Sequence, residues 1–276
     1  MKKILITGAS DGIGLEIARL LAQEGNQLQL VARNQEKLEN VIKSLPGKGH
    51  GFLIADLSKK EDAHKIADHI STNHYDVLIN NAGTGMYGRF EEMSMEQMAS
   101  MLNLNMFGLT VLSLSYLKSA RTGDALVNIA SSLGLSSFPG LAAYSATKAY
   151  VANFSDALWW ENKSKGIYVL GFCPGATYTS FHKTAGGESE AFPKFVMQSA
   201  PNVAKELVRA LKRRKKPRVV SGITNRFMLF FQRFLSRKMV VRMMGSFSPL
   251  NKIKQSVITQ NNYGNDSHSL HGRASH

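Results

Sequence analysis

Short apolar runs rich in β-branched residues alternate along the chain with longer segments in which apolar residues recur every three or four positions. The short runs predict seven strands, at residues 4–7, 28–32, 51–54, 77–79, 125–129, 167–172 and 218–220. Strands that are apolar on both faces are typical of a parallel sheet covered by helices, so we predict an α/β fold with a three-layer, doubly wound sheet. Ligand loops in such folds follow the carboxyl ends of the strands, where we expect the functional residues.

Length and composition narrow the class of protein. The 276 residues suit one domain with a sizeable core, and 43% hydrophobic with 20% charged residues excludes wholesale disorder. Cys173 is the only cysteine, which excludes an intramolecular disulfide and a cysteine-rich zinc site and agrees with a reducing compartment. Only three strongly apolar residues precede Thr7, too few for a signal-peptide core, so we expect a cytoplasmic protein.

Two uncharged stretches are close to the length of a membrane-spanning helix. Residues 97–117 are interrupted by Asn103, Asn105 and serines, and residues 125–147 contain Pro139, glycines and serines. We predict that neither spans a membrane.

The net charge of +14 is concentrated in one segment. Residues 205–242 contain 13 Lys or Arg and one acid, whereas the rest of the chain has 21 bases and 19 acids. The chain outside residues 205–242 is therefore nearly neutral. We predict one domain over residues 1–222, a basic amphipathic helical extension over 223–250 and a disordered tail over 251–276. His268, His271 and His276 in that tail are more simply solvated than metal-bound, and we expect no metal site.

A glycine-rich turn joins the first predicted strand to a helix. Gly8, Gly12 and Gly14 would let the backbone approach a pyrophosphate closely, and the helix N-terminus would add free N–H groups and a partial positive charge. The spacing is neither G-x-G-x-x-G nor a triphosphate-binding loop, so a tight turn without a ligand is the alternative.

Further motifs follow in order: Asn80-Asn81-Ala82-Gly83 after the fourth strand, Asn105 in the next helix, Ser131 after the fifth strand, and Tyr144-x3-Lys148. Each alone is weak, since a Tyr and a Lys four apart on a helix are usually surface neighbours. Together with Thr-Gly-x3-Gly-x-Gly they span residues 1 to about 180 and resemble the short-chain dehydrogenase/reductase family. The resemblance implies a Rossmann fold and assembly into a homodimer or homotetramer through the helices that contain Asn105 and Tyr144.

The resemblance also implies which residues bind a nicotinamide dinucleotide. Along the pyrophosphate, adenine, ribose and nicotinamide these would be Gly8, Ser10, Gly12, Ile13, Gly14, Asp56, Leu57, Asn80, Ala82, Gly83, Pro174, Gly175 and Thr179, together with Tyr144 and Lys148.

The end of the second strand bears on the choice of cofactor. An acid there would bind a ribose 2′-hydroxyl, but the chain has Ala32 followed by Arg33, whose guanidinium suits a 2′-phosphate. This predicts NADP(H) in preference to NAD(H). Asp11 weakens the prediction, because another NADP-preferring branch of the family has a base in the glycine turn, and an Arg33 that merely faces solvent is the alternative.

Tyr144 and Lys148 suggest acid–base chemistry. A phenol with a pKa near 10 exchanges protons near neutrality only if its anion is stabilised, and Lys148, one helical turn away, would lower that pKa. By resemblance Tyr144 is the general acid or base, Lys148 also holds the nicotinamide ribose, Ser131 binds the substrate oxygen, and the backbone of Asn105 holds a water. The nearby Ser132 is more simply structural. The predicted activity is reduction of a ketone or aldehyde, or oxidation of the secondary alcohol, by hydride transfer.

Residues 181–200 are expected to select the substrate as a lid with a flexible joint at Gly186-Gly187. Their apolar side chains, which are Phe181, Phe192, Phe195, Val196 and Met197, predict a carbonyl substrate with an apolar body or, alternatively, only close the core.

One helix is predicted over residues 225–244. It would place Arg226, Arg233 and Arg237 on a narrow stripe beside Phe227, Phe230, Phe231 and Phe234. Three interpretations compete: packing over the cleft or a subunit, peripheral contact of 223–244 with the inner membrane face, and nucleic-acid binding. Packing is slightly favoured, because Lys238 and Arg242 intrude on the apolar face, and nucleic acid is disfavoured. For the whole chain, a dinucleotide sensor or scaffold without turnover, or a membrane-associated module, is the alternative to an enzyme.

Overall fold

The computed structural model describes residues 1–186, 196–248 and 250. Its centre is a seven-stranded parallel sheet in the order β3-β2-β1-β4-β5-β6-β9. The strands are β1 (Lys3–Thr7), β2 (Gln27–Ala32), β3 (Gly51–Ile54), β4 (Val77–Asn80), β5 (Ala125–Ile129), β6 (Tyr168–Cys173) and β9 (Arg218–Val220). The seven strands and the doubly wound parallel sheet confirm the predicted fold.

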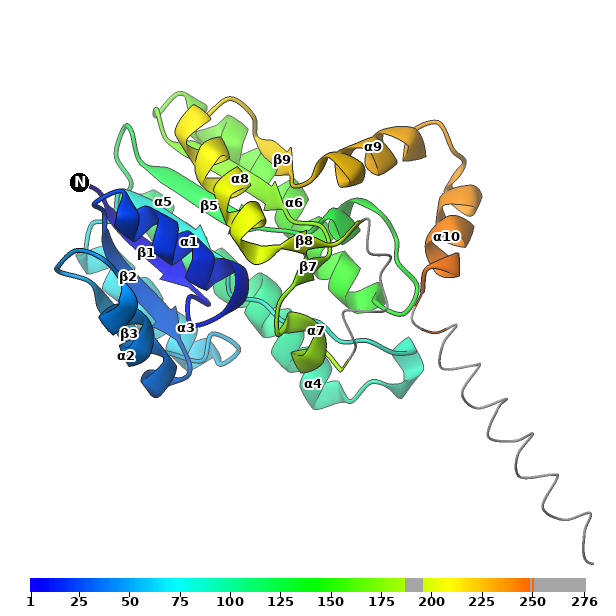
Figure 1. Cartoon of the computed structure of the whole chain (residues 1–276), viewed down its shortest axis with the longest axis horizontal. Coiled ribbons are helices and arrows are strands. Elements are labelled where there is room, and N and C mark those ends of the chain that lie inside the picture. The colour runs from blue at the N-terminus through cyan, green and yellow to red at the C-terminus, as the bar shows by residue number, and fades with distance from the viewer. Residues whose placement is uncertain (187–195, 249, 251–276) are drawn as a thin grey trace, which may run out of the picture.

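Helices cover both faces of this sheet (Figure 1). On one face lie α1 (Gly12–Gln23), α2 (Gln35–Ser44) and α8 (Ala200–Arg213), and on the other lie α3 (Lys60–Thr72), α5 (Leu109–Ser119) and α6 (Ala142–Lys163). Every residue of β4, β5 and β6 is buried, as apolar runs between two helical layers require.

The helix over Met95–Ser119 is long and apolar enough to cross a membrane by length and composition. It comprises α4 (Met95–Leu102), a π-helical turn η2 (Asn103–Gly108) and α5. Met101, Leu112 and Tyr116 on it are buried in core clusters. The stretch is therefore part of the helical layer on the sheet.

Several short elements surround the carboxyl ends of the strands and have no counterpart in the sequence prediction. They are the helical turns η1 (Phe90–Glu92) and η3 (Ser132–Leu135), the short helix α7 (Phe181–Thr184), and a two-stranded parallel sheet of β7 (Thr177–Tyr178) and β8 (Gln198–Ser199).

The basic C-terminal segment forms two helices, α9 (Ile223–Gln232) and α10 (Arg237–Ser246), where one had been predicted. The chain bends between them, and the Ser236 side chain accepts a hydrogen bond from the Met239 N–H at the start of α10. Val240 and Met244 of α10 are buried in a cluster with Tyr144. The segment therefore completes part of the interior, and the tail predicted over 251–276 lies outside the described residues.

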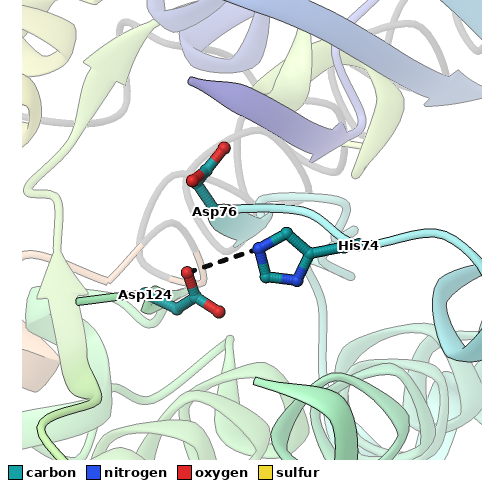
Figure 2. A group of neighbouring side chains, drawn as sticks. All are labelled: His74, Asp76 and Asp124. Carbon is teal, nitrogen blue, oxygen red and sulfur yellow. Dashed lines mark ion pairs between the residues drawn. The ribbon is translucent and has the colours of Figure 1, made fainter. Parts of the chain in front are cut away.

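The opposite, amino-terminal edge of the sheet holds three polar side chains, His74, Asp76 and Asp124 (Figure 2). His74 Nε2 lies 3.7 Å from Asp124 Oδ1. Both carboxylates also accept hydrogen bonds from the backbone: Asp76 from the Lys3 N–H at 2.7 Å, and Asp124 from the Arg121 N–H at 2.6 Å. These carboxylates tie together the segments that lead into β1, β4 and β5.

Candidate active site

A cavity of about 1090 Å³ lies at the carboxyl edge of the sheet. Fifteen of the eighteen predicted site residues line it: Gly8, Ser10, Gly12, Ile13, Arg33, Asp56, Leu57, Ala82, Gly83, Ser131, Tyr144, Lys148, Pro174, Gly175 and Thr179. The loops after six neighbouring strands thus contribute to one site, as parallel topology requires.

The glycine turn at one end of the cavity has little room for side chains. Gly8 and Gly12 have φ of +64° and +56°, a region that favours glycine. The hydroxyl of Thr7 accepts hydrogen bonds from the N–H groups of Asn81 and Ala82, both at 3.0 Å, which fixes the turn to the loop after β4.

Asp11 caps the helix that follows this turn. Its carboxylate accepts a hydrogen bond from the Gly12 N–H at 2.6 Å and another from the Ser180 hydroxyl at 2.5 Å. One of the free N–H groups expected at the start of α1 therefore already has a partner. Asp11 also connects the glycine turn to the segment that leads into α7.

Arg33 lies after β2 with 68% of its side chain exposed, and its guanidinium is 4.0 Å from Asp56. Lys37, in the first turn of α2, lines the same end of the cavity, and Asn34 caps that helix through the Lys37 N–H at 2.8 Å. Sequence reasoning missed Lys37. The sequence did contain an indication of Lys37 as a phosphate ligand, because it is a second base four residues after Arg33 and lies near the start of a predicted helix.

Three predicted site residues do not line the cavity. Gly14 packs against the Gly8 carbonyl, where a Cβ atom would clash. Asn80 is buried inside the sheet, where its side chain donates to Ser113 and Asn128 at 3.0 Å each and so joins β4 to β5. Its neighbour Asn81 lines the cavity instead and donates to the Gly8 carbonyl at 3.0 Å.

Asn105, the third such residue, is completely buried in the π-helical turn η2. Its amide oxygen accepts from the Thr84 N–H at 3.0 Å, while its amide nitrogen donates to the Thr84 carbonyl at 2.8 Å and to the Thr147 hydroxyl at 3.1 Å. The side chain therefore holds the loop after β4 against α6, next to Lys148.

Tyr144, Lys148 and Ser131 come together at the other end of the cavity. Tyr144 and Lys148 share one face of α6, and the Lys148 ammonium lies 5.9 Å from the centre of the Tyr144 ring. Lys148 Nζ donates a hydrogen bond to the carbonyl of Ile129 at 2.8 Å, and Ile129 precedes Ser131 by two residues. All three side chains are at least nine-tenths buried.

Burial dominates the protonation of these groups. It raises the pKa of Tyr144 to about 12, against the opposing effect of a hydrogen bond with Ser131, and it lowers the pKa of Lys148 to about 8. Burial is the largest effect on the Tyr144 pKa, and its direction is opposite to the lowering predicted from Lys148.

The wall beside Tyr144 is largely apolar. The ring centres of Phe181 and Tyr144 are 5.5 Å apart, and Met228 of α9 and Met244 of α10 also line the cavity. Val196 and Met197 pack at its edge, half-buried. The other lid residues predicted from the sequence, Gly187, Phe192 and Phe195, lie outside the described residues.

Two polar features of this wall were not predicted. The Tyr87 hydroxyl is 2.8 Å from Nδ1 of His182, whose Nε2 lies 3.1 Å from the Thr177 carbonyl. Asn225 of α9 is buried over Gly175, leaving no space there for a Cβ atom. Sequence offered no signal for either, since both depend on contacts between distant segments.

Comparison with known proteins gives a consistent result. The family model described as short chain dehydrogenase matches residues 2–190. Carbonyl reductase family member 4 of Danio rerio is 34% identical over 190 residues, which cover 68% of this chain and 79% of that protein. Inactive hydroxysteroid dehydrogenase-like protein 1 of Pongo abelii is 33% identical over 184 residues, 64% of this chain and 56% of that protein.

Among solved structures, a short-chain dehydrogenase from Sphingobium yanoikuyae in complex with NADPH superposes with a TM-score of 0.75. The match covers 100% of this chain and 98% of that one at 24% sequence identity, which establishes a shared fold.

Proposed function

The chain belongs to the short-chain dehydrogenase family and is an oxidoreductase of alcohol and carbonyl groups, and we propose that it uses NADP(H) to reduce a ketone or aldehyde with an apolar body. One observation supports this above the others. Tyr144, Lys148 and Ser131 converge at one end of a cavity whose other end holds Arg33 and the glycine turn.

The residues present fit a nicotinamide dinucleotide. Gly8 and Gly12 leave backbone rather than side chains facing the cavity, and a Cβ at Gly83 would lie 3.2 Å from both Lys148 Nζ and Asn105 Oδ1. These residues would hold the pyrophosphate and ribose, with Pro174, Gly175 and Thr179 beside the nicotinamide. The cofactor would supply or accept the hydride.

Arg33 and Lys37 support the preference for NADP(H). Both are exposed bases at the end of the cavity where Asp56 and Leu57 would flank an adenine. Two cations bind a 2′-phosphate well, and Lys37 lies in the first turn of α2, whose N-terminus carries a partial positive charge. A 2′-hydroxyl would gain little from them.

Tyr144 would deliver the proton in the reductive direction. Because burial raises its pKa to about 12, the hydroxyl is fully protonated near neutrality and can donate to a carbonyl oxygen as negative charge develops there. Ser131 would provide a second donor to the same oxygen. Lys148 would stabilise the phenolate after transfer, since its ammonium lies beside the ring.

A panel of ketones, aldehydes and secondary alcohols with NADPH, NADP⁺, NADH and NAD⁺ tests the proposal. We expect Tyr144→Phe to bind NADPH like the wild type and to lose turnover by at least about a hundred-fold. Tyr178→Phe is the matched control, since that tyrosine is 51% exposed outside the cavity. NADPH binding without turnover of any panel member would instead favour a dinucleotide sensor without catalytic activity. One of the similar proteins, hydroxysteroid dehydrogenase-like protein 1 of Pongo abelii, is itself named as inactive.

We also propose that the enzyme is a homodimer or homotetramer. Leu114 of α5 and Trp160 of α6 support this, being 55% and 69% exposed on the two helices that the family resemblance assigns to assembly. Light scattering should give a multiple of the chain mass, reduced by Leu114→Asp. A monomeric mass for the wild type would exclude the proposed assembly.

A further inference from the structure

We propose that the outer face of α9 and α10 binds an anionic membrane surface. This face, called here the C-terminal face, consists of Phe227, Phe230, Phe231 and Phe234 with the bases Arg233, Arg237, Lys238 and Arg242. It is independent of the proposed catalytic chemistry, because none of these eight residues lines the cavity.

The aromatic side chains of the C-terminal face point outward. Phe227, Phe230, Phe231 and Phe234 are 64, 53, 49 and 73% exposed. They form one cluster, with ring centres 4.5 Å apart for Phe227 and Phe231 and 5.4 Å apart for Phe230 and Phe234. Phe227, Phe230 and Phe231 share one side of α9, and Phe234 follows just beyond the end of that helix. Contiguous exposed aromatics of this kind indicate an interaction surface.

Among the described residues, α9 and α10 line the cleft through Met228 and Met244, but the phenylalanines do not take part in this packing. Packing of the phenylalanines against a second subunit stays a prediction. Packing over the cleft would bury the phenylalanines, yet the buried side chains of these helices are others, chiefly Asn225, Val240 and Met244. The inner face of α9 and α10 thus contacts the body of the protein, and the phenylalanines face away from it. Figure 1 shows both helices (orange) at the side of the molecule remote from β3.

The charge on the C-terminal face indicates an anionic partner. The sequence has no Asp or Glu from residue 207 to residue 250. Arg226 is paired with Glu206 at 2.6 Å, but Arg233, Arg237, Lys238 and Arg242 are exposed and have no ion pair among the described residues. Four exposed cations in the same segment as an aromatic cluster match a lipid surface, where phenylalanine enters the headgroup boundary and bases contact acidic lipids.

Charge also argues against a second copy of the chain as the occupant. A two-fold interface places the same patch on both sides, so these four cations would face four more with no acid between them. Nucleic acid would pair with the cations. It would bury the exposed phenylalanines less than a lipid surface does.

Vesicle co-sedimentation of the full chain tests the proposal. We expect binding to vesicles of equimolar phosphatidylcholine and phosphatidylglycerol, and little binding to phosphatidylcholine alone. The double variant Phe230→Ser/Phe234→Ser should weaken the partition coefficient at least about ten-fold. The triple variant Arg233→Gln/Arg237→Gln/Lys238→Gln should weaken it by about a hundred-fold at low salt, at roughly five-fold per charge.

The chain offers matched controls for both changes. Phe90→Ser removes a phenylalanine that is 61% exposed on η1, and Lys43→Gln/Lys48→Gln/Lys65→Gln removes three exposed bases from other surfaces. Both controls should bind vesicles like the wild type. Melting temperatures close to the wild-type value would show that every variant is folded.

Three results would overturn the proposal. The first is equal sedimentation of the wild type with anionic and neutral vesicles, and the second is equal loss in the control variants. The third is a change in molecular mass on substituting Phe230 and Phe234 without a change in vesicle binding, which would identify a second copy as the occupant. Because the assay needs no cofactor or substrate, an inactive enzyme would leave its outcome unaffected.

Discussion

Gly134 is the point at which the Ser131 loop touches the helix that holds Tyr144 and Lys148. A Cβ built at Gly134 would lie 2.5 Å from the Lys148 carbonyl carbon, 2.6 Å from its oxygen and 2.7 Å from the Ala149 nitrogen. All three atoms are backbone, so no side chain can rotate away. Ordinary carbon contacts begin near about 3.5 Å, so Gly134→Ala must separate η3 from α6 by about 1 Å.

This displacement has two measurable consequences. Overpacking of this kind costs about 1–3 kcal/mol, and at about 2–4 °C per kcal/mol the melting temperature should fall by about 2–12 °C. If the site acts as proposed, a shift of about 1 Å between Ser131 and Tyr144 should lower kcat by about a hundred-fold. NADPH affinity should change less than kcat, because Arg33, Lys37 and the glycine turn come from other loops of the cavity.

Calorimetry and steady-state kinetics on Gly134→Ala and Gly245→Ala would test this reasoning. Gly245 lies in α10, and a Cβ there would be 3.6 Å from Pro139 Cγ, an ordinary contact. Its substitution should raise stability by up to about 1 kcal/mol through helix propensity. The close-packing argument is refuted if Gly134→Ala melts as high as the wild type and retains its kcat.

Other substitutions have similarly definite outcomes. Arg33→Gln and Lys37→Gln should each weaken NADPH binding about ten-fold or more in calorimetric titrations. The control Lys43→Gln, at the far end of α2, should leave NADPH binding unchanged. Equal losses of NADH binding in the Arg33 and Lys37 variants would contradict a 2′-phosphate site. The pKa of Lys148 is about 8 in the folded protein against 10.5 in the unfolded chain, so the unfolded state binds more protons between these values. The free energy of unfolding should therefore rise with pH across this window by up to about 3 kcal/mol more in the wild type than in Lys148→Met, and parallel pH profiles would show that the buried ammonium is not responsible. Asn105→Leu should lower the free energy of unfolding by about 2–5 kcal/mol, because Thr84 and Thr147 lose their partners, while the exposed Asn202→Leu should change it little in denaturant titrations.

The sheet was predictable because each strand is a short apolar run whose boundaries coincide with polar or glycine residues. Ile4 to Thr7 and Ala125 to Ile129 illustrate this, since both end where the structure begins a ligand-lining loop. The ordered motifs also located most of the cavity, including Ser131 and Tyr144, which are thirteen residues apart in sequence and line the same cavity.

Features that depend on long-range packing were not predictable. The strands β7 and β8 have two residues each, too short for any periodicity. Asn80 has the right motif position but turns into the sheet toward Asn128, a contact that only the β4–β5 pairing creates. Pattern alone gave one helix over 225–244, because Arg233 and Phe234 continue the period through the bend that Ser236 caps.

The contact between α10 and Tyr144 also determines when the site can form during synthesis. Residues 144 and 244 are 100 positions apart, and Met244 packs in the same buried cluster as Tyr144. At about 5–20 residues per second, a ribosome needs roughly 5–20 s to pass from one to the other. Strands β6 and β9 are also made in this interval, so the sheet is complete only after residue 220. The buried cluster around Tyr144 is completed later still, when α10 has been synthesised and packs against it.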